Sequence, residues 1–450
     1  MGIPAKYSGK YFFHFTHIQD LDSIVKNGIL CTNKKDELGT THLDAASETI
    51  QERRSTMEVT CAPKGKVHDY VPCYFCSMNP MVLSLINSKN VDQQFILFFA
   101  IPIDKLIDDN VIFTDASANT GIPPSFYTDP ADLENLDWKA IQSKKWRHIY
   151  KDELRRRMAE VLVKDSVPMS MIEHIVVWNE GIKKRVEETF KKNKVECPSV
   201  IYQPLNSTYH FHFTRFTISQ GTSSLITGPF FLKLNYEKAI EHILEKRGSM
   251  KPKVKYLFEN IEDAIPKIEG DFCLIEEMKG IFELETKNEV HSENVSDHTL
   301  QVVEKLEALK YYQNSKPKDK NVLKLSAYLH DIGKGPKSRW KDGIQPGYPD
   351  HPADAPEMLK RILVEDFKEI SEYEIKKICI LVTYHDLIGE IIGKGRNVQQ
   401  LIDIVENEKT LEMLATLNLA DVSAINRNWR NHYNDKIEDL KIEVLEKIGK

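Results

Sequence analysis

The pattern of hydrophobic and polar positions divides the chain into three parts. Up to about Cys197, short runs rich in Val, Ile, Phe and Tyr alternate with polar loops, which is typical of buried strands in a mixed α+β domain. The clearest strands are expected at residues 11–15, 71–75, 95–103 and 175–178. Helices are expected at residues 21–27, where Gly28 stops the pattern, and at about 152–163, before Pro168.

The middle part, residues 206–286, has weaker periodicity. Tyr209, Phe211 and Phe213 alternate with polar residues, which predicts a strand with its polar face outward, and residues 236–246 read as a helix. We interpret this part as a connecting region or small subdomain, whose histidines are exposed and unligated.

After Glu289, apolar residues recur at spacings of three and four. Val322, Leu325, Leu329 and Ile332 form one such stripe, which Gly333 ends. The last part is therefore expected to be all-α. The predicted domains are residues 1–205, 206–286 and 287–450.

Composition indicates a globular cytoplasmic protein. Hydrophobic residues make up 41% of the chain, but no apolar run reaches the ~18 residues of a membrane span, and the N-terminus lacks the features of a secretory signal. The seven cysteines are scattered without a disulfide framework, which suits a reducing compartment. Cys73 and Cys76 form a lone CxxC motif, which we interpret as two buried strand residues rather than a zinc site.

The net charge of −6 argues against a protein that coats duplex nucleic acid nonspecifically. A nucleic-acid substrate would need a local basic patch. The candidates are three short clusters, for which solvated helix faces are the alternative: Arg53–Arg54; Lys144, Lys145 and Arg147; and Arg155–Arg157.

Metal-binding residue types gather on inward-facing positions of the C-terminal part. His330 and Asp331 end an apolar helix in LSAYLHDIGKG, where an imidazole and a carboxylate can bind one divalent ion. His298 follows a predicted N-cap, Ser296, and shares a stripe with apolar residues. Asp421 interrupts another apolar stripe, where a carboxylate is costly unless it is paired or metal-bound.

Two further histidines extend this set: His385 on the buried stripe of ILVTYHD, and His351 in the polar loop YPDHPADAP. In this order the residues resemble the HD superfamily of metal-dependent phosphohydrolases, over roughly residues 287–450. The resemblance implies that His298, His330, Asp331 and Asp421 hold one ion and that Asp331 bridges to a second ion at His351 and His385. The alternative is that these are unrelated, internally satisfied side chains.

This resemblance also implies the chemistry of the domain. Lys334, in HDIGK, would meet a phosphate of a small nucleotide or phosphodiester substrate. One or two ions (Mn, Fe, Co, Ni, Zn or Mg) suit such ligands, and paired metals activate water for phosphoryl transfer.

The N-terminal part has no Walker loop, Rossmann fingerprint or Ser-His-Asp context. Instead, polar residues lie within β-rich segments: His14 and Thr16 in FFHFTHIQD, Arg54 in SETIQERRSTMEV, Tyr74 and Met81 in HDYVPCYFCSMNPM, and Glu160 in RRRMAEVLVKDSVP. These segments, in this order, resemble the DarT family of nucleic-acid ADP-ribosyltransferases over roughly residues 8–190.

The DarT resemblance implies an ADP-ribosyltransferase fold, a split β-sheet around NAD. His14 and Thr16 would contact the adenosine-ribose side of NAD, and Tyr74 and Met81 the nicotinamide. Glu160 would be the catalytic carboxylate, with Arg54 positioning substrate or NAD phosphate. The alternative for Glu160 is an ordinary exposed helix carboxylate.

The leading hypothesis is transfer of ADP-ribose from NAD to a nucleobase in single-stranded DNA, within a toxin or anti-phage system. The HD domain would restrain, reverse or complement this transfer. In a second hypothesis the HD domain is a nucleotide phosphohydrolase or phosphodiesterase and the N-terminal domain only binds a nucleotide. In a third, the protein binds nucleic acid through vestigial sites.

Overall fold

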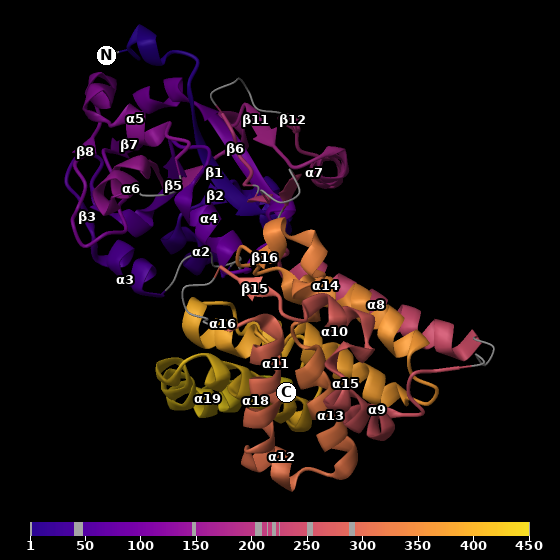
Figure 1. The fold of residues 1–450 in the computed structure, drawn as a ribbon. Helices are drawn as coiled ribbons and strands as arrows, with labels where there is room; N and C mark the ends of the chain where they lie inside the picture. The colour runs from indigo at the N-terminus through magenta and orange to yellow at the C-terminus, as the bar shows by residue number, and fades with distance from the viewer. Residues whose placement is uncertain are drawn as a thin grey trace. The chain divides into compact units, whose positions relative to one another are not determined.

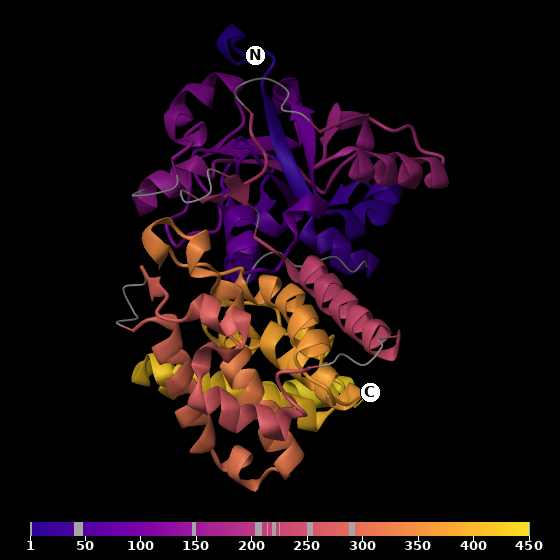
Figure 2. The same cartoon turned by 45° about the vertical axis from the view of Figure 1, so that its right-hand side comes forward.

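A computed structural model describes residues 2–39, 48–145, 150–202, 209–213, 215–217, 222–224, 226–249, 255–287 and 293–449. The chain forms two compact units, Met1–Ile86 with Val91–Phe213 and Asn87–Asn90 with Thr214–Lys450. Figures 1 and 2 show a strand-rich first unit in indigo to magenta and a helical second unit ending in yellow. Within the described ranges, no helix is both long enough and apolar enough to cross a bilayer.

An eight-stranded sheet organises the first unit, with strand order β12-β11-β6-β1-β5-β9-β7-β8. Its neighbours pair antiparallel, except for the parallel pair β11–β12. The strands are β1 (Tyr11–His17), β5 (Tyr70–Tyr74), β6 (Ile96–Pro102), β7 (Val111–Thr114), β8 (Phe126–Tyr127), β9 (Glu160–Lys164), β11 (His174–Val176) and β12 (Ser199–Ile201). The four strands expected from the sequence are all present, as β1, β5, β6 and β11.

The sheet separates between its two central strands. β1 pairs with β6 along its whole length, from Tyr11↔Pro102 to His17↔Ile96. With β5 it shares only Phe13↔Tyr74, whereas β5 pairs with β9 from Tyr70↔Lys164 to Tyr74↔Glu160. This is the split sheet that the resemblance implied, and it leaves space between β1 and β5.

Both faces of the β5–β9–β7 portion are covered, because side chains alternate along each strand. Val71 and Val161 lie in the main core, whereas Tyr70, Ile112 and Leu162 lie in a smaller core on the opposite face. The remaining elements flank the sheet: α1 (Leu21–Asn27), α2 (Thr32–Leu38), α3 (Glu48–Thr56), α4 (Pro80–Asn87), α5 (Trp138–Ile141), α6 (Lys151–Arg157), α7 (Glu180–Asn193), and the paired short strands β2 (Ile29–Leu30) with β10 (Ser166–Val167) and β3 (Glu58–Val59) with β4 (Gly65–Lys66).

The prediction of a helix at residues 152–163 is wrong for its second half. α6 ends at Arg157, and Glu160 begins strand β9. The β-branched Val161 and Val163 find partners on both β5 and β7, and this pairing prevails over the helical pattern. Glu160 is therefore the first residue of an interior strand, paired on both sides with neighbouring strands.

Residues 209–213 do not form the predicted strand, although Tyr209, Phe211 and Phe213 are buried as the alternation required. Their backbone is held by side chains instead of a neighbouring strand. The Gln93 side chain bonds both the N–H and the C=O of Phe213, and the Ser77 hydroxyl donates to the His210 carbonyl. The expectation of exposed histidines is wrong for His212, whose pKa burial lowers to about 4.

The second unit packs helices around a single hydrophobic core. The helices are α8 (Pro229–Ser249), α9 (Ile261–Gly270), α10 (Glu276–Ile281), α11 (Val295–Glu307), α12 (Lys310–Asn314), α13 (Pro317–Leu329), α14 (His351–Glu365), α15 (Glu372–Thr383), α16 (Leu387–Lys394), α17 (Gln399–Ile402), α18 (Glu408–Ile425) and α19 (Arg427–Ile448). Its strands are two short pairs: β13 (Arg215–Thr217) with β14 (Thr222–Ser224), and β15 (Glu285–Thr286) with β16 (Ile344–Gln345).

Three local expectations for this unit are wrong. Asn294, rather than Ser296, caps α11, because its side chain accepts the Asp297 N–H. His351 is the first residue of α14, not part of a loop. The helix predicted to run to Gly333 ends at Leu329, and a 3-10 turn follows at Ile332–Lys334.

Gly333 in that turn lies against the start of α14. A Cβ at Gly333 would lie 1.9 Å from the His351 carbonyl oxygen and 3.2 Å from the Ala355 nitrogen. Both contacts are with backbone atoms, which cannot rotate away. The glycine therefore allows His351 to approach the His330–Asp331 segment.

We predict that Gly333→Ala displaces α14 and destabilises the second unit by about 1–3 kcal/mol, the usual cost of overpacking. Thermal unfolding followed by circular dichroism measures the change. Gly393→Ala is the matched control, because a Cβ at this helical glycine meets nothing within 4 Å and should not lower the midpoint. Equal midpoints for Gly333→Ala and wild type would contradict the prediction.

Candidate functional site

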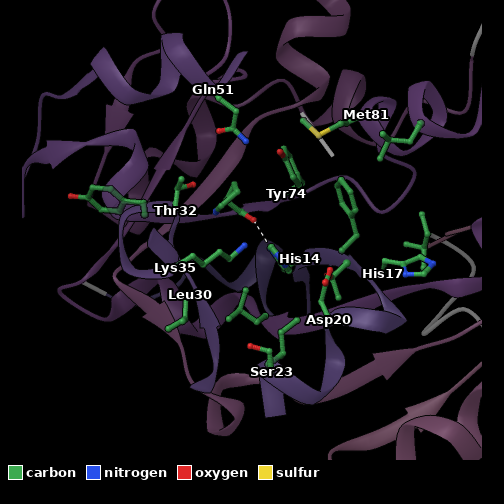
Figure 3. A pocket seen from close by; sticks show the side chains of 18 of the residues that line it. His14, His17, Asp20, Ser23, Leu30, Thr32, Lys35, Gln51, Tyr74 and Met81 are labelled. Atoms are coloured by element: carbon green, nitrogen blue, oxygen red, sulfur yellow. Dashed lines mark hydrogen bonds between the residues drawn. The ribbon is translucent and has the colours of Figure 1, made fainter. Parts of the chain in front are cut away.

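A cavity opens where β1 and β5 diverge in the first unit (Figure 3). One wall comes from β1 and α1 and the other from β5, with further side chains from α2, α3 and α4. Its lining includes five of the six residues that the sequence singled out: His14, Thr16, Arg54, Tyr74 and Met81.

His14 bridges the two diverging strands. Its Nδ1 lies 2.8 Å from the Pro72 carbonyl oxygen on β5, the contact dashed in Figure 3. Burial lowers the pKa of His14 to about 4, so the ring is neutral at pH 7 and Nδ1–H donates to that carbonyl. Thr16, on the same face of β1, donates its hydroxyl to Asp20 at 3.0 Å.

Glu160 lies behind the cavity wall rather than on it. Its side chain is fully buried, and the Arg54 Nη1 lies 3.2 and 3.0 Å from its two carboxylate oxygens. Burial opposes the charge on Arg54, but Glu160 outweighs that effect and the pKa of the guanidinium is raised. The exposed helix carboxylate considered as an alternative is therefore excluded.

Three further groups fix Glu160. The Ala118 N–H donates to Oε1 at 2.8 Å and the Ser117 hydroxyl at 3.3 Å, while the Glu160 N–H donates to the Thr114 hydroxyl at 3.0 Å. Arg54 keeps one buried nitrogen, Nη2, with no hydrogen-bond partner in the described part of the chain. The pair thus presents an unused donor beside a cavity that Arg54 itself lines.

Tyr74 joins this pair to the cavity. It faces Glu160 in the β5–β9 register and stacks on Phe15, with ring centroids 5.9 Å apart. Burial and the Glu160 charge raise the pKa of its hydroxyl, so it stays protonated. Tyr74 and Met81 are neighbours at one end of the pocket (Figure 3).

Sequence reasoning missed several polar residues of this lining. Thr32, Lys35 and Gln51 come from helices or their edges without a motif that marks them. Only the fold brings them beside β1, so no signal in the sequence identified them.

Most described side chains of the three basic clusters bind other groups of the protein and so do not form a free basic patch. Arg157 is buried and donates to the Lys145 carbonyl, whereas Arg156 pairs with both Asp137 and Asp152. Arg53 is exposed, and Arg147 lies outside the described residues.

In the second unit, the six candidate metal ligands converge from five segments and are all buried. They are His298 on α11, His330 and Asp331 after α13, His351 at the start of α14, His385 after α15 and Asp421 on α18. Two triads, His298–His330–Asp331 and Asp331–His351–His385, have spacings suited to a metal ion.

Asp331 belongs to both triads through different oxygens. Its Oδ2 lies 3.4 Å from His330 Nε2 and 3.9 Å from His298 Nε2. Its Oδ1 lies 3.2 Å from His351 Nε2 and 3.9 Å from His385 Nε2. Asp421 closes the first group, with Oδ1 2.9 Å from His298 Nε2.

Backbone carbonyls orient three of the imidazoles. His330, His351 and His385 each place Nδ1 within 2.7–2.8 Å of the carbonyl oxygen three residues earlier. In the neutral ring Nδ1 then carries the proton, so Nε2 offers a lone pair to the centre, the usual arrangement of metal-binding histidines.

The donor set fits divalent ions. The Nε2 atoms of His351 and His385 face each other at 3.1 Å, and His330 Nε2 is buried with no hydrogen-bond partner among the described residues. Burial lowers the pKa of His330, yet Asp331 and Asp421 raise it to about 9, because the surrounding carboxylates favour a positive charge here. A metal cation among these atoms would replace the proton on His330 and would satisfy the Nε2 lone pairs of His351 and His385.

Two other side chains adjoin this centre. Lys334 Nζ lies 2.5 Å from Asp331 Oδ2, so the predicted phosphate contact is paired with a candidate ligand in this structure. Asp386 was not predicted, although its carboxylate lies 3.5 Å from His351 Nε2 and 3.6 Å from His385 Nε2. The signal was a second His-Asp dipeptide at 385–386, which repeats the one at 330–331.

Comparisons with known proteins agree with both units. The profile of the family described as "ssDNA thymidine ADP-ribosyltransferase, DarT" matches residues 13–210, and that of the HD domain matches residues 291–421. A DNA ADP-ribosyl transferase of Thermus aquaticus is 32% identical over 180 residues, 39% of this chain and 78% of the relative. Another, from Thermus sp. (strain 2.9), is 30% identical over 186 residues, 40% of this chain and 87% of the relative.

A solved structure of Thermus sp. 2.9 DarT in complex with ADP-ribosylated ssDNA aligns at 26% identity and a TM-score of 0.41, covering 47% of this chain and 99% of that chain. The sequence relationship decides the family, because the Thermus aquaticus relative reaches its 32% identity over 78% of its own length. The chain therefore belongs to the DarT family of ADP-ribosyltransferases, and it carries an HD domain after the transferase unit.

Proposed function

We propose that this enzyme transfers ADP-ribose from NAD to a nucleobase in single-stranded DNA, with Glu160 as the catalytic carboxylate. The observation that carries the proposal is the buried Arg54–Glu160 pair next to Tyr74, where the sheet splits and the cavity opens. The family description names thymidine, and we take thymidine as the target.

The residues suit this chemistry. Cleavage of the nicotinamide–ribose bond develops positive charge on the ribose, which the Glu160 carboxylate stabilises. The same carboxylate accepts the proton that the attacking base nitrogen loses, which requires that substrate binding uncover Glu160, since its side chain is fully buried in this structure. The unused Nη2 donor of Arg54 suits an NAD phosphate oxygen, since guanidinium groups bind phosphate strongly.

The other cavity residues have binding roles in this proposal. His14 and Thr16 contact the adenosine-ribose side of NAD, and Tyr74 and Met81 the nicotinamide ring. The low pKa of His14 keeps its ring neutral, so it contacts NAD as a hydrogen-bonding group and not as a cation.

For the HD domain we propose two divalent ions and hydrolysis of a phosphate ester in a small nucleotide or phosphodiester. When bound, such ions supply an activated water and stabilise charge on the phosphoryl group. His298, His330, Asp331 and Asp421 would hold one ion, and Asp331, His351 and His385 the other. The support is the set of convergent lone pairs described above. Lys334 would exchange its contact with Asp331 for a substrate phosphate.

We further propose that the protein acts in the cytoplasm as a toxin or in anti-phage defence. An ADP-ribosylated base no longer pairs normally, so its formation would block copying of DNA. The HD domain would restrain, reverse or complement that modification. All seven cysteines are free, which suits a reducing compartment.

The direct test incubates the full chain with NAD and single-stranded oligonucleotides that contain one thymidine or none, and with RNA. Mass spectrometry should show one ADP-ribose added to the thymidine oligonucleotide and release of nicotinamide. If NAD is never consumed while phosphohydrolase activity is present, the N-terminal unit only binds a nucleotide, which is the second hypothesis.

Glu160→Gln should lower transfer by ~100- to 1000-fold, because one electrostatic contact to the developing charge is removed. NAD binding, measured by calorimetry, should remain. Glu160 is fully buried, so the uncharged amide leaves Arg54 without its ion partner and should lower the unfolding midpoint. Transfer is therefore measured well below that midpoint.

Glu188→Gln is the matched control for this variant, because it removes an exposed carboxylate on α7. It should transfer at the wild-type rate. Near-normal transfer by Glu160→Gln would remove Glu160 from the mechanism.

The two activities should be separable. Elemental analysis of the purified protein is expected to find one or two divalent ions per chain. The double variant His330→Ala, Asp331→Ala should contain none. Phosphohydrolase activity should then fall to background while NAD cleavage continues, since the transferase residues belong to the other unit. Complete loss of NAD cleavage in a double variant that still folds would instead indicate one composite site.

A further inference from the structure

The Asp386 carboxylate lies close to two candidate metal ligands, and it does not cap the helix that it precedes. It precedes α16 at the N-cap position, yet its side chain accepts no capping hydrogen bond. Among the described residues, the basic side chains within 4 Å of its carboxylate are the imidazoles of His351 and His385.

Those imidazoles cannot act as donors to it in their neutral form. Both rings direct Nδ1 at a backbone carbonyl, of Tyr348 and Val382, at 2.8 Å. The Nε2 atoms that face Asp386 therefore carry lone pairs. Two nitrogen lone pairs and a carboxylate then face one another, and a shared cation removes this repulsion.

The geometry mirrors that of the first ion site. Asp421 is a carboxylate outside the Asp331 triad that contacts His298 at 2.9 Å and His330 at 3.9 Å. Asp386 contacts the second histidine pair in the same way, at 3.5 and 3.6 Å. Each ion site then has two imidazoles and one carboxylate of its own, Asp421 or Asp386, and Asp331 is common to both sites.

We propose that Asp386 is a ligand of the second divalent ion, which completes a site of two histidines and two aspartates. This inference rests on the two-ion centre proposed above and names a ligand that centre lacked. Oxygen and nitrogen ligands of this kind suit Mn²⁺, Fe²⁺, Co²⁺ or Zn²⁺.

Exposure distinguishes the two ends of the centre. The Asp386 side chain is 27% exposed, against 8% for Asp421. A second ion held by Asp386 would be the more solvent-accessible of the two.

The test titrates Mn²⁺ into metal-free full-length protein by calorimetry and follows the bound ions by electron paramagnetic resonance. Wild type should bind two equivalents and show the exchange-coupled spectrum of two ions that share a carboxylate. Asp386→Asn and Asp386→Ala should weaken the second equivalent by on the order of 100-fold or more and show an isolated Mn²⁺ spectrum, because loss of even an outer-shell partner costs up to about 100-fold. The first equivalent should keep its affinity.

Two variants serve as controls. Asp297→Asn changes an exposed aspartate next to a first-site histidine, but its carboxylate bonds Asn294 at 2.7 Å, so both equivalents should persist. Asp386→Glu keeps a carboxylate and should restore part of the second equivalent, which a purely structural role would not predict.

The outcomes separate this inference from the two-ion proposal. If wild type binds fewer than two equivalents, the two-ion centre itself is wrong. If it binds two, and folded Asp386→Asn or Asp386→Ala binds two with unchanged affinity, Asp386 is not a ligand. Loss of both equivalents from folded variants would also overturn the assignment, because Asp386 would then support the whole centre. If both variants fail to fold, Asp386→Glu decides: a weakened second equivalent beside an unchanged first confirms the assignment, and unchanged affinity for both equivalents overturns it.

Discussion

The transferase unit depends on one interruption in strand pairing. β1 is fully paired on its β6 side but meets β5 only at Phe13↔Tyr74, so a continuous sheet would have no cavity here. The His14–Pro72 contact holds the diverging strands together at the opening, which keeps the gap at a defined width. Every residue proposed to bind NAD lines this gap.

Tyr74 connects that opening with the Arg54–Glu160 pair, because it takes part in both the β1 pairing and the β9 pairing. Opposite it, Glu160 is buried, and Arg54, Ser117 and the Ala118 N–H satisfy its charge. Burial of a carboxylate is costly without such partners. The same partners orient it for a single task, so its stability and its proposed catalytic role depend on the same contacts.

In the HD domain, too, contacts that stabilise the fold also orient the candidate site residues. The carbonyl three residues before each of His330, His351 and His385 fixes its ring, so local backbone geometry sets the direction in which these three imidazoles point. Gly333 lets α14 approach closely enough for His351 to meet Asp331. A glycine that offers no ligand of its own thus determines whether the two triads share a carboxylate.

The sequence by itself determined four strands of the central sheet (β1, β5, β6 and β11), the helical character of the second unit and the identity of most candidate residues. These features follow from local periodicity and from residue types that are costly to bury without a partner, such as Asp421. The segment at Glu160 read as helix, because its pairing with β5 and β7 is a long-range contact that periodicity does not encode. Tertiary structure alone decided that Glu160 is buried, that Lys35 and Gln51 border the cavity, and that Asp386 faces two histidines. Each of these depends on segments distant in the chain coming together, and a single sequence without its fold holds no distances between them.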